Sequence, residues 1–354
     1  MLRAGLRWPV VRAGAAWVAV LVAVALTTAS GGSSPASAGP VRAQPAQSCV
    51  AEPGAGPGGS TLYPDCAYCP GVDPNGVNGD VMDIYTPAGA VAGDHFPTLV
   101  WVHGGGWEMG NAGAGKKLGT DGYSLAVATA LLTSRGFVVA AVDYRLTNPH
   151  NNMNPPEFQF PDQIIDVKCA LRYLRAHADS YYVDSGHIMA MGSSAGGHLV
   201  SLAGTAPPSA GFECQSGDTA DWCSQSSAVH AVVDEWGVSD FTDSTWGLHA
   251  SQVIQQVFGH TPGVDNPVLE RASPVTYIAP GDPDFLIIQG DEDPLNTPPQ
   301  GGPEFAQRLG LAGVHATLYL VHHAAHGALE PGEQPGITEL EQDVLSFIET
   351  EATS

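Results

Sequence analysis

The sequence has few basic residues. Lysine and arginine together number 13 among 354 residues, against 36 aspartates and glutamates, so the formal net charge is −23. A surface this acidic repels phosphate backbones and anionic lipid headgroups. We therefore expect no nucleic-acid partner and a chain that stays in solution.

Long apolar runs are also scarce, and the one candidate stands at the start of the chain. Three arginines among the first twelve residues precede apolar residues 13–26, and small residues follow up to Ala36-Ser37-Ala38. This order is typical of a secretory signal peptide. A membrane anchor is the alternative, but about 14 apolar residues are fewer than the ~20 that span a bilayer. We therefore expect residues 1–38 to be a signal peptide and the mature chain to be secreted, without a membrane span.

Six cysteines fit an oxidising compartment, although six allow 15 pairings and the sequence does not choose among them. Cys214 and Cys223 bracket a short polar loop, so a local disulfide is the best single guess. Cys66 and Cys69 form a CxxC motif, but no βαβ pattern surrounds it and no second CxxC completes a zinc site. With Cys49, they are expected to cross-link the N-terminal segment rather than to carry redox chemistry.

The chain shows no internal repeat and no linker between two cores. Residues 39–78 are rich in glycine and proline and predict an irregular N-terminal segment. Residues 79–354 alternate buried strands with amphipathic helices and predict one catalytic domain. Strands are expected at residues 81–85, 98–103, 137–144, 188–192, 231–236, 285–290 and 317–321.

This alternation predicts an α/β fold, with a mostly parallel central sheet and helices on both faces. Residues 205–228 and 240–272 exceed what a simple crossover needs. We expect them to be small insertions over the C-terminal edge of the sheet, where substrate-shaping elements usually lie.

A G-x-S-x-G motif surrounds Ser194, between a predicted strand and a predicted helix. The pentapeptide alone is weak evidence in a chain so rich in glycine, but a strand–turn–helix context is what the motif requires. Such a turn exposes the serine hydroxyl and directs the next backbone N–H, that of Ala195, at the charge that develops.

A second motif, His103-Gly104-Gly105-Gly106-Trp107, begins at the end of the predicted strand at residues 98–103. Three consecutive glycines expose backbone N–H groups, as an oxyanion hole requires. A flexible turn is the alternative. The position before the G-x-S-x-G motif is that of the oxyanion element in lipases and esterases, which favours the functional interpretation.

The orienting acid and the base are expected downstream, in that order. Asp293 and His326 each follow a predicted strand, at the edge where open α/β sheets place their sites. Of the neighbouring acids, Asp291 is expected to cap the turn and Glu292 to be solvated. His322 and His323 are expected to be structural or surface groups. A zinc site on these histidines is the alternative, but no H-E-x-x-H helix accompanies them, so we expect no metal and no cofactor.

These motifs, together with Val142-Asp143-Tyr144-Arg145-Leu146, resemble the α/β-hydrolase esterases from about residue 81 to the final helix. The similarity is closest to the hormone-sensitive-lipase-like group and to bacterial acyl- and feruloyl-esterases. The resemblance implies Ser194 as nucleophile, His326 as base and Asp293 as its orienter. It also implies an oxyanion hole made by the N–H groups of Gly105, Gly106 and Ala195, with Gly104 as a further candidate, and a structural role for Asp143 and Arg145.

The chain departs from that group after Leu146, where Thr147-Asn148-Pro149-His150 replaces the usual Ala-Pro-Glu. We expect a secreted serine esterase that acts on a small-molecule or polymer-linked carboxylic ester. An amide or peptide hydrolase and a non-catalytic binding protein of the same fold are the alternatives. Trp107, Tyr144, His198 and Trp236 are candidates for lining the pocket, although core packing is the commoner role of such aromatics.

Overall fold

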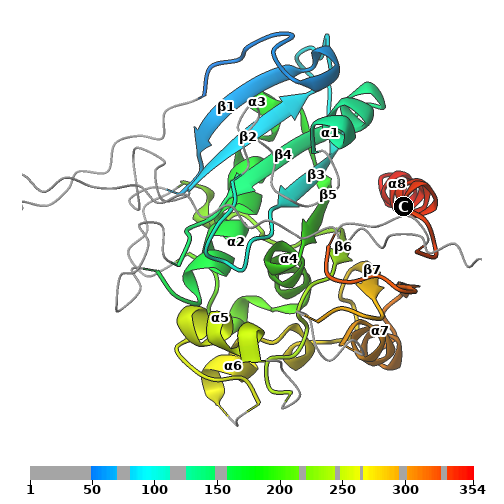
Figure 1. The fold of residues 1–354 in the computed structure, drawn as a ribbon. Coiled ribbons are helices and arrows are strands. Elements are labelled where there is room, and N and C mark those ends of the chain that lie inside the picture. Colours follow the sequence, from blue (N-terminus) through cyan, green and yellow to red (C-terminus); the bar gives the residue numbers. More distant parts are fainter. Residues whose placement is uncertain are drawn as a thin grey trace, which may run out of the picture. The chain divides into compact units, whose positions relative to one another are not determined.

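The computed structural model describes residues 49–69, 80–111, 125–147, 158–214, 221–243, 248–263, 266–294, 301–327 and 333–354. The proposed signal peptide lies outside them. The described residues form an eight-stranded sheet in the order β1-β2-β4-β3-β5-β6-β7-β8 (Figure 1). The strands are β1 (Thr61–Ala67), β2 (Val81–Thr86), β3 (Phe96–Val102), β4 (Val138–Asp143), β5 (Val183–Ser193), β6 (Ala231–Glu235), β7 (Asp284–Gly290) and β8 (Ala316–Val321).

Most of the sheet is parallel. Strand β2 runs antiparallel to both β1 and β4, and every other neighbouring pair is parallel. The helices are α1 (Leu125–Ser134), α2 (Asp162–Ala176), α3 (Ala178–Tyr181), α4 (Ala195–Thr205), α5 (Leu248–Phe258), α6 (Pro267–Ala272), α7 (Gly301–Leu311) and α8 (Ile337–Glu351). Short 3-10 helices lie at Pro57–Gly59, Pro208–Ala210, Asp221–Ser224 and Pro274–Thr276. The predicted fold class is confirmed.

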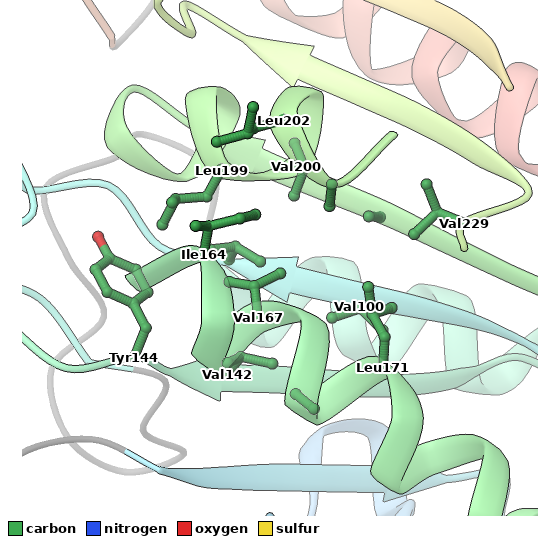
Figure 2. Close-up of a cluster of buried hydrophobic side chains, with 14 of the residues drawn as sticks. Val100, Val142, Tyr144, Ile164, Val167, Leu171, Leu199, Val200, Leu202 and Val229 are labelled. Carbon is green, nitrogen blue, oxygen red and sulfur yellow. The ribbon is translucent and has the colours of Figure 1, made fainter. Parts of the chain in front are cut away.

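Two apolar clusters cover the two faces of the sheet because side chains alternate along each strand. In β3, Val100 and Val102 belong to the cluster under α2, α4 and α7, whereas Leu99 and Trp101 belong to the cluster under α1 and α8. Figure 2 shows the first cluster, in which Ile164, Val167 and Leu171 of α2 lie with Leu199 and Val200 of α4. Both strand faces are therefore buried, as the apolar strand sequences indicated.

The prediction of an irregular segment at residues 39–78 was wrong for residues 61–67. These residues form β1, which pairs with β2 and makes the segment part of the sheet. The register shifts between Tyr63 and Cys66, and Asp65 has φ 48°, so the strand contains a bulge. Pro64 and this bulge break the alternation by which a strand is recognised, because proline fits only an edge strand or a bulge.

The placement of the first insertion was also wrong. Helix α4 starts at the C-terminal edge of the sheet and runs back across it, so residues 205–228 begin at the opposite edge. Gly204 accordingly lies beside Phe285 at the start of β7, and His230 N–H donates to Ile188 O near the N-terminal half of β5. The second insertion, residues 240–272, does reach the C-terminal edge, where α5 contacts the glycine-rich loop after β3.

Two disulfides are present among the described cysteines. Cys214 is bonded to Cys223, as expected, and Cys49 is bonded to Cys66. Cys69 does not take part in the N-terminal cross-link, and it remains a thiol, as does Cys169.

Candidate active site

Ser194 occupies a sharp turn between β5, which ends at Ser193, and α4, which begins at Ala195. Its backbone has φ 56° and ψ −115°, a conformation that non-glycine residues rarely adopt. Two hydrogen bonds hold it, from Ser194 N–H to Glu235 O at 2.7 Å and from His198 N–H to Ser194 O at 3.0 Å. Backbone strain of this kind is characteristic of functional sites.

The two flanking glycines of the motif are required by space. A Cβ on Gly196 would lie 2.0 Å from Val102 O, and a Cβ on Gly192 would lie 2.5 Å from Gly196 C. The turn therefore packs directly against the end of β3. Because β3 neighbours β5 in the sheet, the loop after β3 and the hydroxyl of Ser194 meet at the same edge.

His326 lies between Ser194 and Asp293. Its Nε2 is 2.8 Å from Ser194 Oγ, and its Nδ1 is 2.7 Å from Asp293 Oδ2. The Asp293 side chain is fully buried, whereas 16% of the His326 side chain is exposed. The structure therefore joins hydroxyl, imidazole and carboxylate in one hydrogen-bonded series, and these three residues come from the ends of β5, β7 and β8.

The carboxylate of Asp293 has a second donor that the sequence did not suggest. Gln289 Nε2 donates to Asp293 Oδ2 at 3.2 Å and also approaches Gly290 O at 3.3 Å. Gln289 is the penultimate residue of β7 and is 1% exposed. A glutamine near a strand end is ordinary, so no sequence signal distinguishes it.

The competing acids and histidines pair with one another outside this series. Asp291 accepts hydrogen bonds from His323 N–H at 2.7 Å and from the His322 ring at 2.9 Å. These bonds lower the pKa of Asp291, chiefly the one from His322. Glu292 pairs with the exposed ring of His323 at 3.1 Å, which raises the pKa of His323. The three neighbouring histidines thus face three different carboxylates and do not converge on a common point.

The glycine-rich loop after β3 has a conformation that only glycine adopts easily. Gly105 has φ 105° and Gly106 has φ 63°. A Cβ on Gly105 would lie 2.0 Å from Met109 O. The backbone N–H of Met109 donates a hydrogen bond to Gly105 O. A side chain at position 105 is thus excluded. The carbonyl oxygen of Gly104 accepts a hydrogen bond from His103 Nδ1–H at 2.7 Å.

The loop is braced by the segment after β4. The hydroxyl of Tyr144 donates to His103 O at 3.1 Å, and the two rings stack with centroids 4.3 Å apart. Arg145 grips Asp166 of α2, with Nη2 to Oδ1 at 2.6 Å and Nε to Oδ2 at 2.9 Å. This ion pair is buried, so it fixes the position of the segment rather than offering a charge to a ligand. The expectation of a structural role for Arg145 agrees with this geometry.

The aromatic residues named as possible pocket-lining groups are all buried. Trp107 donates from Nε1 to His198 Nδ1 at 3.2 Å, and His198 Nε2–H donates to Ala272 O at 2.8 Å. Trp107 also packs against Phe241 and against Phe258 of α5. Tyr144 and Trp236 are 1% and 7% exposed. Trp107, Tyr144 and His198 therefore support the loop from beneath, whereas Trp236 belongs to the apolar cluster under α1 and α8.

Two buried histidines near Ser194 have environments unlike that of His326. Burial lowers the pKa of His103 to about 4 and that of His198 also to about 4. At His198 the cause is visible, because Nδ1 must stay unprotonated to accept from Trp107 while Nε2–H donates to a carbonyl. Both rings are therefore neutral near pH 7.

Comparison with known proteins adds a family to this geometry. The family model BD-FAE matches residues 82–309, well over half of the chain. The chain belongs to the BD-FAE family. Its members have an α/β-hydrolase-like domain, in agreement with the sheet order and with the resemblance expected from the motifs.

Relatives and solved structures of similar architecture carry esterase names. The BD-FAE chain is 32% identical over 238 residues to the probable carboxylic ester hydrolase LipM of Mycobacterium tuberculosis, covering 64% of this chain and 49% of LipM. It spans about half the length of the curated relatives it matches first. A truncated carbohydrate esterase from gut microbiota has a TM-score of 0.65 and 26% identity, covering 83% of this chain and 97% of that one.

A second solved structure is esterase Est2 of Thermogutta terrifontis with butyrate bound. It has a TM-score of 0.57 and 26% identity, covering 76% of this chain and 90% of Est2. Within the part of the BD-FAE chain that the structure describes, no helix combines the length and hydrophobicity needed to cross a bilayer.

Proposed function

We propose that this chain is a secreted serine esterase that hydrolyses carboxylic esters through an acyl-enzyme. The observation that carries the proposal is the hydrogen-bonded series from Ser194 Oγ through His326 to the buried Asp293, with distances of 2.8 and 2.7 Å. The esterase names of relatives and structural neighbours support the same reaction class.

In the first half-reaction, Ser194 Oγ attacks the ester carbonyl while His326 Nε2 takes its proton. Asp293 accepts a hydrogen bond from Nδ1–H of His326, which leaves Nε2 as the free base and stabilises the imidazolium that forms. His326 then gives the proton to the alcohol oxygen, so the alkoxide leaves as an alcohol. In the second half-reaction, water attacks the acyl-enzyme by the same route and returns the proton to Ser194.

The oxyanion is assigned to backbone N–H groups of Gly105, Gly106 and Ala195, with Gly104 less directly placed because its carbonyl holds His103. Ala195 is the first residue of α4, so its N–H lies at the positive end of the helix dipole. The absence of side chains at residues 105 and 106 supports their assignment, because it leaves the backbone N–H groups of this loop accessible.

Export is part of the proposal. The arginine-rich start, the short apolar run and the A-x-A site support it, and so do two disulfides in the described residues. Expression of the full chain should release into the medium a protein whose amino-terminal sequence begins at Gly39. A product that starts at Met1 and stays with the cells would contradict export.

The variant Ser194→Ala tests the nucleophile. Turnover of p-nitrophenyl acetate and butyrate should fall by about 10⁴-fold or more, because neither attack nor the acyl-enzyme remains possible. A fluorophosphonate probe should label the wild-type protein and not the variant. Circular dichroism and the melting temperature serve as controls for folding.

Turnover by Ser194→Ala equal to that of the wild type would overturn the assignment. A protein that carries the intact series and yet neither labels nor hydrolyses any ester would indicate the non-catalytic alternative. Matched ester and anilide substrates distinguish the amide hydrolase, since a protein that cleaves both at similar kcat/KM would not be a dedicated esterase.

A further inference from the structure

The two cysteines that remain thiols, Cys69 and Cys169, lie together in the fold. Cys69 follows β1, and Cys169 occupies the middle of α2, where it is 2% exposed. Cys169 Sγ donates to the carbonyl of Tyr68, the residue before Cys69, at 3.3 Å. The backbone that carries one cysteine is therefore in direct contact with the sulfur of the other.

The two thiols also interact electrostatically. Their interaction raises the pKa of Cys69 and lowers that of Cys169. Since Cys49–Cys66 and Cys214–Cys223 are already bonded, no other cysteine of the sequence is left to pair with either of these two.

We propose that Cys69 and Cys169 form a third disulfide in the exported protein. The proposal rests on the proposed secretion, because an oxidising compartment supplies the oxidant, a protein or small-molecule disulfide. One thiolate attacks that disulfide and forms a mixed disulfide. The second thiolate then displaces the carrier sulfur, so two cysteine thiols lose two electrons and two protons while the oxidant is reduced to two thiols.

The proposed Cys69–Cys169 disulfide joins residues much farther apart in the sequence than the other two disulfides do. Cys49–Cys66 and Cys214–Cys223 close loops with sequence separations of 17 and 9, whereas Cys69 and Cys169 are a hundred positions apart. It ties the edge of the sheet to α2, whose Asp166 holds Arg145 and, through the segment after β4, the glycine-rich loop. In the chain-entropy account, a longer closed loop stabilises the folded state more.

A metal site is the competing use of Cys69. Its sulfur and carboxylate oxygens of Asp80 and Asp166 lie within 4.8 Å of one another, and the buried carboxylate oxygens of Asp80 have no hydrogen-bond partner among the described residues. However, both oxygens of Asp166 already accept from Arg145. Burial, helped by the nearby Asp166, raises the pKa of Asp80 to about 9, so it is protonated near neutral pH and needs no cation. The disulfide is therefore the better account.

Mass spectrometry of the protein collected from the medium tests the bond. Denaturation with N-ethylmaleimide and without reductant should give no alkylation and an intact mass six hydrogens below that of the reduced chain. Two modified residues, at Cys69 and Cys169, would overturn the proposal. Tightly bound zinc in native mass spectra, with thiols that alkylate only after chelation, would overturn it in favour of the metal site. Retention of an uncleaved chain in the cells would instead contradict export.

Peptide mapping locates the bond without any variant. Trypsin cleaves after Lys168 and Arg172, so Cys169 lies in the short peptide Cys-Ala-Leu-Arg, while Cys69 lies in the peptide of residues 43–116. Because residues 43–116 also contain Cys49 and Cys66, the linked peptides of the unreduced digest are fragmented in the mass spectrometer, and the fragments should join Cys169 to Cys69. A linkage of Cys169 to Cys49 or Cys66 would contradict the assignment.

Variants measure what the bond does. Cys69→Ala and Cys169→Ala should each lower the melting temperature by about 10 °C, and the double variant by no more than either single one, because all three lose the same link. The double variant Cys214→Ala/Cys223→Ala is the matched control, with a smaller expected loss because its loop is short. Additive losses from the two single variants would indicate two packed thiols instead of a bond.

Discussion

Three histidines, His326, His103 and His198, lie near Ser194, in two regions of the molecule. The two regions differ in the groups that form hydrogen bonds with the imidazole nitrogen atoms. At the rim of the sheet, His326 has a carboxylate on Nδ1 and a hydroxyl on Nε2. Beneath the glycine-rich loop, His103 donates to the carbonyl of Gly104, and His198 is fixed between the indole of Trp107 and the carbonyl of Ala272. All three rings lie near the same turn, but only His326 is hydrogen-bonded to a carboxylate. The Nε2 atom of His103 lies 3.7 Å from Asp143 Oδ1, and both nitrogen atoms of His198 face uncharged groups.

This difference shows how the same side chain is adapted to two tasks. Burial lowers the pKa of His103 and His198, whose hydrogen-bond acceptors are backbone carbonyls that orient a neutral ring. Asp143 lies near His103, but the Nε2 atom of His103 makes no hydrogen bond among the described residues. A buried carboxylate compensates an imidazolium, as a general base requires. We therefore expect the interior histidines to act as structural hydrogen-bonding groups and His326 to carry the proton.

Among the tests of this comparison, the largest effect is expected from replacing His326 and His198, one at a time, by glutamine. His326→Gln should lower kcat/KM for p-nitrophenyl butyrate by about 10³-fold or more, because glutamine cannot take the proton of Ser194. His198→Gln keeps a donor and an acceptor in the interior, so it should retain activity within about tenfold and lose stability instead. Steady-state kinetics and thermal melts on both variants make the comparison.

Equal losses of turnover in the two variants, with both proteins folded, would contradict the division into a proton carrier and a structural group. A fluorophosphonate-labelling rate sharpens the result, since labelling also needs an activated hydroxyl. His326→Gln should label far more slowly than the wild type, while His198→Gln should label at nearly the wild-type rate.

The sequence alone predicted which residues meet at the C-terminal edge of the sheet, but it did not predict the hydrogen bonds between buried residues. Ser194, Asp293 and His326 each follow a predicted strand, and parallel strands end at a common edge, so their meeting followed from topology. The choice of Asp293 over Asp291 agrees with the contacts observed, since Asp291 instead caps the turn and pairs with His322. What the sequence could not show were contacts between distant segments, such as Gln289 on Asp293 or His198 on Trp107.

The errors have the same physical origin. Strand β1 was missed because Pro64 and the bulge at Asp65 hide its alternation, and its pairing with β2 is what makes it a strand. Residues 205–228 were placed at the wrong edge of the sheet. The preceding helix, α4, crosses the sheet from its C-terminal edge, so the segment after the helix begins at the opposite edge. Local pattern indicates which element forms, whereas position depends on tertiary contacts.

An intermediate effect is expected in the pH dependence of stability. The folded state binds no proton on His198 until about pH 4, whereas the unfolded chain binds one near pH 6.5. The unfolded state therefore holds more protons between these values, and this ring's contribution to stability falls as the pH falls through that window. The contribution of the buried Asp234, whose pKa is raised to about 6, has the opposite sign. The measurement is thus a difference between wild type and variant.

Urea unfolding of wild type and His198→Gln at pH 7.5 and pH 5 isolates the histidine. The variant's deficit in unfolding free energy should shrink by about 2 kcal/mol at the lower pH, because only the wild type has this ring to protonate on unfolding. Asp234 is present in both proteins and cancels. A deficit that is the same at both values would show that folding does not lower the pKa of this ring.

The smallest expected effect concerns the donor that supports Asp293. Gln289→Leu removes the Nε2–H donor at 3.2 Å while filling a similar volume, so the carboxylate keeps His326 but loses part of its own fixation. A single hydrogen bond of about 1 kcal/mol corresponds to a roughly fivefold lower kcat, with KM little changed. The variant Gln289→Glu is a more discriminating test. It places a second buried carboxylate beside Asp293, and two such carboxylates favour a shared proton. This variant should therefore displace the pH–rate profile as well as lower kcat. Leucine and glutamate variants with the wild-type kcat and the wild-type profile would show that Asp293 is held in place without Gln289.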